Sequence, residues 1–166
     1  MPSRILCAGC LAVFATQAQA ECVQALTVTF VESAPRDRFE ISHTATGVFV
    51  SDISIDLRRS SGALIFDTAA GGAGVEVFQP FEAGAGVGDA QIADGADQLS
   101  IRLDALSAGQ RTGFTIDVDD QQAQSDLGQI RVTGAEIAGA RVIFTLVDGE
   151  TLEAEFDAQN RAKVCT

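Results

Sequence analysis

Short stretches in which hydrophobic and polar residues alternate run through most of this 166-residue chain. A period of two places every second side chain on the same face of a β-strand, whereas a helix needs a period of 3.6. The stretches are short and turn-forming residues separate them, so they predict an antiparallel all-β fold. The clearest of them are 26–30, 38–42, 53–58, 99–103, 114–119, 142–146 and 152–156.

About nine such strands in one chain favour two packed antiparallel sheets, that is, an immunoglobulin-like sandwich. Ile130 and Val132 form a further, shorter stretch of this kind, and Asp148-Gly149 between two stretches predicts a hairpin turn. Val48 and Val50 share a parity that the stretch from Ile53 does not. A β-bulge near Ser51-Asp52 would reconcile the two.

Residues Asp67–Gly88 are rich in glycine and alanine. Each glycine costs a helix about 1 kcal/mol relative to alanine, so this region is expected to form turns or a loop. Phe78, Pro80 and Phe81 lie within it. They are predicted to form an exposed partner-contact loop, with anchoring of the loop to the core as the alternative.

Met1–Ala20 has the features of a cleaved secretory signal peptide helix. Arg4 supplies a positive charge, Ile5–Ala15 is apolar but too short to span a bilayer, and Ala18-Gln19-Ala20 gives a small-x-small cleavage site. A lipoprotein with Cys10 as the modified residue is the less favoured alternative. The chain is therefore predicted to be exported to the periplasm or beyond.

Glu21–Thr166 is predicted to be a single β-sandwich domain with no membrane span. Cys22 and Cys165 remain at its two ends after cleavage. In an oxidising compartment the simplest expectation is a Cys22–Cys165 disulfide. On the chain-entropy model a loop of this length contributes roughly 4–5 kcal/mol to stability.

The chain carries a formal net charge of −12. This charge disfavours nucleic acid and anionic lipid as partners, because their phosphates would be repelled. It favours solubility, cation binding or a basic partner.

One acidic run suggests a particular cation site. Asp117 and Asp119 of a predicted strand point to the same face with carboxylates about 6–7 Å apart, and Asp120 follows. Calcium binds six to eight oxygens and tolerates irregular geometry, so these residues predict a calcium site. Asp126 in the next loop is a further expected ligand, and Asp67 or Glu76 could complete the set. The alternative is that the aspartates only solvate an exposed strand and its turn.

Residue types that commonly support catalysis are scarce. His43 is the only histidine, which excludes multi-histidine zinc sites, and no Gly-x-Ser-x-Gly motif is present. The chain contains no Trp and no Tyr, so it lacks the aromatic platforms usual in sugar-cleaving clefts. A hydrolase is therefore disfavoured, and His43 is expected to be structural at the end of a strand.

Five segments, which together extend over most of the chain after Ala20, are similar to one known family: 30–39, 62–67, 74–82, 114–120 and 132–140. They resemble the small secreted bacterial proteins called aggregation factor core proteins. The resemblance implies a β-rich extracellular or periplasmic domain and calcium-dependent aggregation or adhesion.

Two hypotheses of function follow. The first is a non-catalytic binding or adhesion module, stabilised by calcium, that docks an extracellular or envelope protein or glycan. The second is a metal-free structural or assembly subunit of the cell envelope, which would meet another β protein at a sheet edge.

Overall fold

The structure is a computed structural model that describes residues 24–32, 36–75, 79–90, 92–122, 129 and 131–165. The chain is mostly β-strand, and its sheets are antiparallel. The predicted signal peptide and Cys22 lie outside the described residues. Within the described ranges, no helix is long and apolar enough to cross a membrane.

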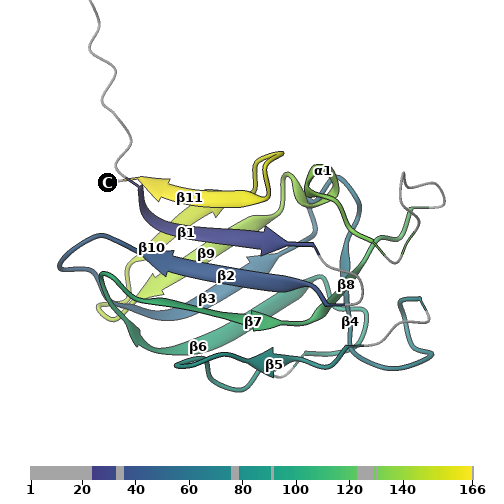
Figure 1. Cartoon of the computed structure of the whole chain (residues 1–166), viewed down its shortest axis with the longest axis horizontal. Coiled ribbons are helices and arrows are strands. Elements are labelled where there is room, and N and C mark those ends of the chain that lie inside the picture. The colour runs from purple at the N-terminus through teal and green to yellow at the C-terminus, as the bar shows by residue number, and fades with distance from the viewer. Residues whose placement is uncertain are drawn as a thin grey trace, which may run out of the picture.

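Two antiparallel sheets face each other and form the body of the molecule (Figure 1). The first has the strand order β11-β1-β2-β7-β5, with bounds Arg161–Cys165, Gln24–Val31, Arg38–His43, Arg111–Thr115 and Glu82–Ala83. The second has the order β10-β9-β3-β6, with bounds Thr151–Glu155, Arg141–Leu146, Val50–Asp56 and Gln98–Leu106. This arrangement confirms the predicted all-β, sandwich-like architecture.

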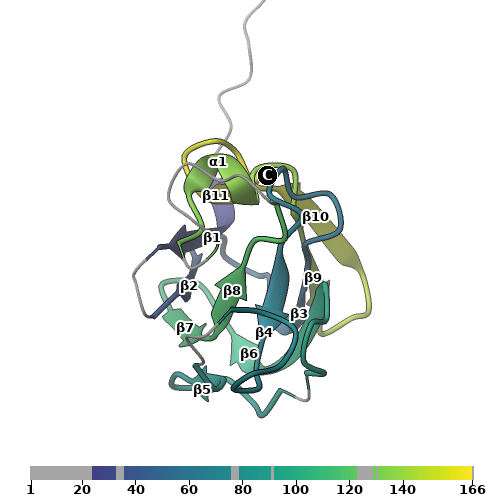
Figure 2. The ribbon, with the colours of Figure 1, turned by 90° about the vertical axis from the view of Figure 1, so that its right-hand side faces the viewer.

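A two-stranded ribbon and a short helix lie at one end of the sandwich (Figure 2). The ribbon pairs β4 (Ile65–Asp67) with β8 (Asp117–Asp119), and the helix is α1 (Gly134–Ile137). Single bridges also link segments at the margins of the two sheets: Val87 pairs with Leu103 of β6, and Phe156 pairs with Ala162 of β11.

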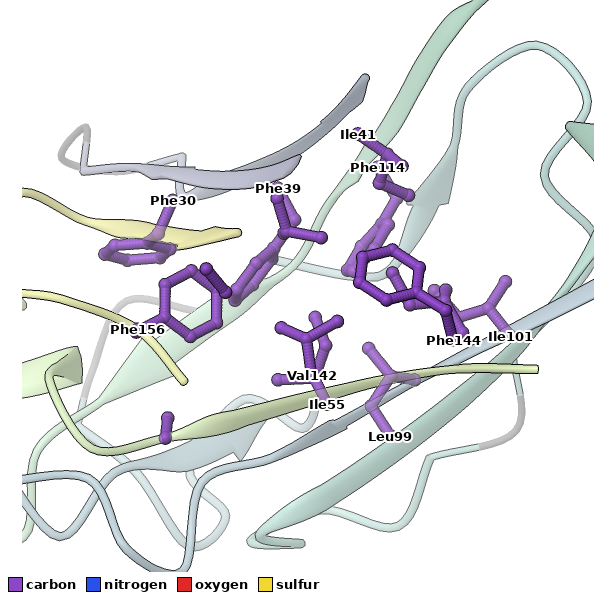
Figure 3. Packing of buried hydrophobic residues seen from close by; sticks show 14 of the residues in the cluster. Phe30, Phe39, Ile41, Ile55, Leu99, Ile101, Phe114, Val142, Phe144 and Phe156 are labelled. Carbon is purple, nitrogen blue, oxygen red and sulfur yellow. The ribbon is translucent and has the colours of Figure 1, made fainter. Parts of the chain in front are cut away.

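The alternating side chains form one core between the two sheets (Figure 3). Phe39 of β2 is fully buried, and its ring centroid lies 5.1 Å from that of Phe30 and 5.1 Å from that of Phe114. Phe66 and Phe156 pack at 6.4 and 6.3 Å from the same ring. Phe39 therefore joins the first sheet, the ribbon and the β10–β11 connection.

Several detailed predictions are confirmed. The pairing of β3 with both neighbours shifts register between Val50 and Asp52, where the bulge was expected. β9 and β10 form the predicted hairpin around Asp148-Gly149. His43 ends β2 and is buried.

Other predictions were wrong. The expected strand at 114–119 is split at Ile116, because β7 stays in the first sheet while β8 pairs with β4. Val132 precedes α1 and is not in a strand, and Ile130 lies outside the described residues. The Thr133-x-x-Glu136 pattern is a capping box that could have indicated α1, since the Thr133 amide donates to Glu136 Oε2 at 2.6 Å.

A pair of phenylalanine substitutions tests this packing. Phe39→Ala is expected to lower the free energy of unfolding by about 3–5 kcal/mol, because it leaves a cavity among four other rings. Phe49→Ala is the matched control, because that ring is 50 % exposed and its removal is expected to cost under about 1 kcal/mol. Urea denaturation of both variants measures the difference, and equal losses would contradict the proposed packing.

Candidate functional site

The β4–β8 ribbon presents two chemically different faces. Phe66 pairs with Val118, and both side chains are fully buried in the core. Alternation places Asp67, Asp117 and Asp119 on the opposite face, with Asp67 directly across from Asp117. The predicted common face of Asp117 and Asp119 therefore gains a third carboxylate from β4.

Five aspartates at this end of the sandwich are buried, with side chains between 0 % and 5 % exposed. We call them the buried aspartate cluster: Asp37, Asp67, Asp117, Asp119 and Asp120. Charged carboxylates are rarely buried unless they are paired, because desolvation strongly disfavours the charged form. The alternative that Asp117, Asp119 and Asp120 solvate an exposed strand is therefore wrong.

Backbone amides satisfy part of the cluster. The Val75 amide donates to Asp119 Oδ2 at 2.7 Å, and the Gln122 amide donates to Asp120 Oδ1 at 2.9 Å. The Val118 amide donates to Asp37 Oδ2 at 3.2 Å. These contacts fix the orientation of three carboxylates but bring no positive charge.

Three carboxylate oxygens of the cluster have no donor in the described part of the chain. The Oδ2 atoms of Asp67, Asp117 and Asp120 are buried and accept no hydrogen bond there. The ion pairs formed by described residues lie elsewhere, at Arg36–Glu82, Arg38–Glu40, Arg58–Asp56 and Lys163–Asp157. The cluster thus combines like charges, burial and unused acceptor atoms.

These conditions change the proton affinity of the carboxyl groups. Burial, followed by the negative charges of Asp119 and Asp37, raises the pKa of Asp117 to about 7. Burial also raises the pKa of Asp119 to about 6, although the Val75 amide opposes the shift. The pKa of Asp67 is raised as well, chiefly by burial.

A loop of small residues covers the carboxylates. Asp94 holds this loop by accepting the amides of Thr68, Ala69 and Ala73 at 2.9, 3.0 and 2.7 Å, and those bonds keep its pKa below the usual range. Gly74 lies so close that a Cβ there would collide with the Oδ2 atoms of Asp67 and Asp119. Only glycine lets the backbone approach this closely.

The described residues provide part of a hard-cation site. Within them, no group of three or more His, Cys, Asp or Glu side chains is already positioned to hold a metal ion. Calcium takes six to eight oxygens, so backbone carbonyls or further side chains would have to contribute. Two predicted ligands, Asp126 and Glu76, lie outside the described residues.

The remaining predicted residues are distributed over other parts of the molecule. Phe81 is partly buried, with its ring centroid 5.4 Å from that of Phe114, Pro80 is exposed, and Phe78 lies outside the described residues. Cys165 ends β11 across from Gln24 of β1. The Cys22–Cys165 disulfide stays a prediction, because Cys22 lies outside the described residues.

Two acidic residues of this region were missed from the sequence. Asp37 precedes β2 and Asp94 lies in an Asp-Gly turn, and neither carries a local pattern that links it to β8.

Comparison with known proteins finds no matching family model, no matching curated protein and no matching solved structure.

The raised pKa values make stability depend on pH. Asp117 binds its proton more tightly in the folded chain than in the unfolded chain, so at neutral to alkaline pH its charge opposes folding. The folded protein therefore becomes more stable, relative to its stability at pH 8, as pH falls from about 8 toward the ordinary pKa that Asp117 has in the unfolded chain. His43 acts in the opposite sense, because burial lowers its pKa and acid then favours unfolding.

Comparison with Asp117→Asn isolates the carboxylate, since His43 is the same in both proteins. In EDTA at pH 8 the variant is expected to be more stable than the parent, on the order of 2–4 kcal/mol, because a buried charge is removed. At pH 5 the gain is expected to shrink by more than half. Denaturation from pH 5 to pH 8 measures it, and a gain independent of pH would show that Asp117 is not perturbed.

Proposed function

We propose that this chain is an exported, non-catalytic binding or adhesion module whose acidic end is stabilised by calcium. The observation that carries the proposal is the buried aspartate cluster with three unpaired Oδ2 atoms. A bound cation would neutralise charges that otherwise repel one another in a region of low dielectric constant.

The donor set favours a hard cation. Carboxylate and carbonyl oxygens are the ligands that calcium prefers, whereas zinc prefers cysteine and histidine. The only histidine, His43, ends β2 at the opposite end of the sandwich from the β4–β8 ribbon (Figure 1). Calcium is favoured over magnesium because it tolerates an irregular ligand set.

Burial also favours binding over hydrolysis. Asp117 and Asp119, whose pKa values are raised to about 7 and about 6, are buried. A hydrolase needs its acid and base within hydrogen-bond distance of the bond to be cleaved, and a buried carboxyl group is not accessible to a substrate in this way. A surface hollow of about 670 Å³ lies on the first sheet. Its Arg38 and Glu40 form an exposed ion pair with each other, which is typical of a solvated sheet face.

An immunoglobulin-like topology is part of this proposal. In that fold the first, second, fifth and fourth strands lie side by side in one sheet, and the third, sixth and seventh form the other. The order β1-β2-β7-β5 facing β3-β9-β10 supports it. β11, β6 and the β4–β8 ribbon would be additions to that pattern.

Two parts of the proposal rest on the sequence. Export rests on the signal-peptide features of Met1–Ala20, and the adhesive role rests on the resemblance to aggregation factor core proteins. The metal-free assembly subunit would dock at a sheet edge, and the strand orders leave β5 and β10 as edge strands besides β6 and β11. It has less support because a metal-free protein would leave the buried aspartate cluster without a neutralising cation.

A thermal-shift experiment tests the metal. Calcium at about 100 times its Kd is expected to stabilise the protein by about 2.7 kcal/mol, a rise of several degrees in Tm that EDTA reverses. Asp119→Asn and Asp120→Asn are expected to abolish most of the rise. Asp104→Asn is the matched control, because Asp104 is exposed on β6.

The control variant should keep the full calcium response. A Tm that neither calcium nor EDTA changes would remove the metal from the proposal. A response of equal size in all the variants would mean that calcium binds outside the buried aspartate cluster.

A further inference from the structure

Two loops meet at the end of the sandwich opposite the β4–β8 ribbon: the β2–β3 connection and the β9–β10 turn (Figure 1). Among the described residues, the two large hydrophobic side chains that are exposed lie here. Phe49 is 50 % exposed and Val147 is 63 % exposed. The Val147 amide donates to the Phe49 carbonyl oxygen at 3.0 Å, which places the two residues side by side.

The two residues border one hollow of about 410 Å³. We call it the apolar tip, and it is lined by Gly47, Val48, Phe49, Leu146, Val147, Asp148 and Glu150. A single exposed hydrophobic residue needs no explanation, but two neighbours around a hollow are the pattern of a contact site.

The exposure of Phe49 follows from the backbone. Val50 is fully buried, and the bulge between Val50 and Asp52 resets the alternation at the start of β3. Ser51 stabilises this bend, because its hydroxyl group donates to the Thr145 carbonyl oxygen at 3.2 Å. Phe49 is thus held outward by the same bulge that lets Val50 enter the core.

The β9–β10 turn is held equally firmly. The Gly149 amide donates to the Leu146 carbonyl oxygen at 2.9 Å, and the Glu150 amide donates to Asp148 Oδ1 at 3.0 Å. Gly149 has a φ of 90°, which favours glycine at this position. A surface that is already ordered loses little conformational entropy when a partner binds.

The charges around the hollow are of one sign. Asp148 and Glu150 are exposed, and no lysine or arginine is among the described residues that line the hollow. The whole chain carries a net charge of −12. A partner that fits this tip therefore presents a bulky apolar side chain flanked by lysine or arginine.

We propose that the apolar tip docks a basic segment of a partner protein, with one apolar side chain inserted between Phe49 and Val147. This inference rests on the proposed binding role and adds the contact surface and the chemistry of the partner. The predicted contact loop around Phe81 is less suited to this role, because Phe81 packs on Phe114 of the core.

NMR titration tests the inference on the purified protein, expressed from the whole chain. The probe is acetyl-Gly-Lys-Lys-Leu-Lys-Lys-Gly-amide, and the control peptide has glutamate in place of each lysine. The basic peptide is expected to shift the backbone amides of residues 47–50 and 146–150, and the acidic peptide is expected to shift none of them. Shifts spread over the acidic surface, or equal binding of both peptides, would overturn the proposal.

Substitutions separate the apolar from the electrostatic contribution. Phe49→Ser and Val147→Ser are each expected to weaken peptide binding at least about fivefold while leaving Tm nearly unchanged, because both side chains are exposed. Asp148→Asn with Glu150→Gln should also weaken binding and reduce its salt dependence. Glu153→Gln on β10 is the control for general charge effects, and an equal loss there would contradict a specific site.

Two further measurements identify the occupant and separate this inference from the metal proposal. Sedimentation that shows a dimer abolished by Phe49→Ser would assign the tip to a second copy of the chain and would overturn the basic partner. Titrations in calcium and in EDTA should agree at the tip. If the peptide binds but calcium does not change Tm, the calcium proposal alone is overturned. If calcium raises Tm but the peptide does not bind, the apolar-tip proposal alone is overturned.

Discussion

Packing of phenylalanine rings between the layers is the interaction on which the rest of the structure depends. Phe39 contacts rings from β1, β4 and β7 and from the segment after β10, so a single side chain joins the first sheet, the ribbon and the β10–β11 connection. Once Phe66 is drawn into this core, alternation turns Asp67 to the other face of β4. Hydrophobic packing of Phe66 thus places Asp67 on the face that the loop of small residues covers, and this loop buries the aspartates.

The buried aspartate cluster lowers the stability of the folded protein, whereas the hydrophobic core raises it. Among the described residues, Asp67, Asp117 and Asp119 form no ion pair. Natural domains are only marginally stable, so these buried carboxyl groups are costly when charged, and protons or a cation would reduce the cost. The covering loop increases the cost, because Gly74 brings the backbone against Asp67 and Asp119 and so contributes to their burial. Asp94, by contrast, retains its charge readily because three backbone amides stabilise it. Aspartate thus has two different roles here: Asp94 is stabilised as a carboxylate and holds the loop, whereas Asp117 is destabilised as a carboxylate by burial.

The sequence predicted what depends on local periodicity. Alternation gave the main strands, and the mismatch between Val50 and Ile53 located the bulge, because both follow from neighbouring residues. The shared face of Asp117 and Asp119 was predicted for the same reason. Their burial was not, because it depends on a Gly/Ala loop about 45 residues earlier in the chain that has no periodic pattern. Asp37 was missed because only tertiary contact brings it to Val118.

Charge alone would not explain the selective binding proposed at the two ends of this molecule. A chain with a net charge of −12 attracts any cation or basic segment weakly, and salt screens that attraction. At the β4–β8 end, the proposed ion would have to fit among the buried carboxylates of Asp67, Asp117 and Asp119. At the other end, Phe49 and Val147 would add a contact that salt does not screen, so a basic partner without an apolar side chain would gain little. In both proposals, the geometry of the site rather than the net charge would determine which positive group is retained.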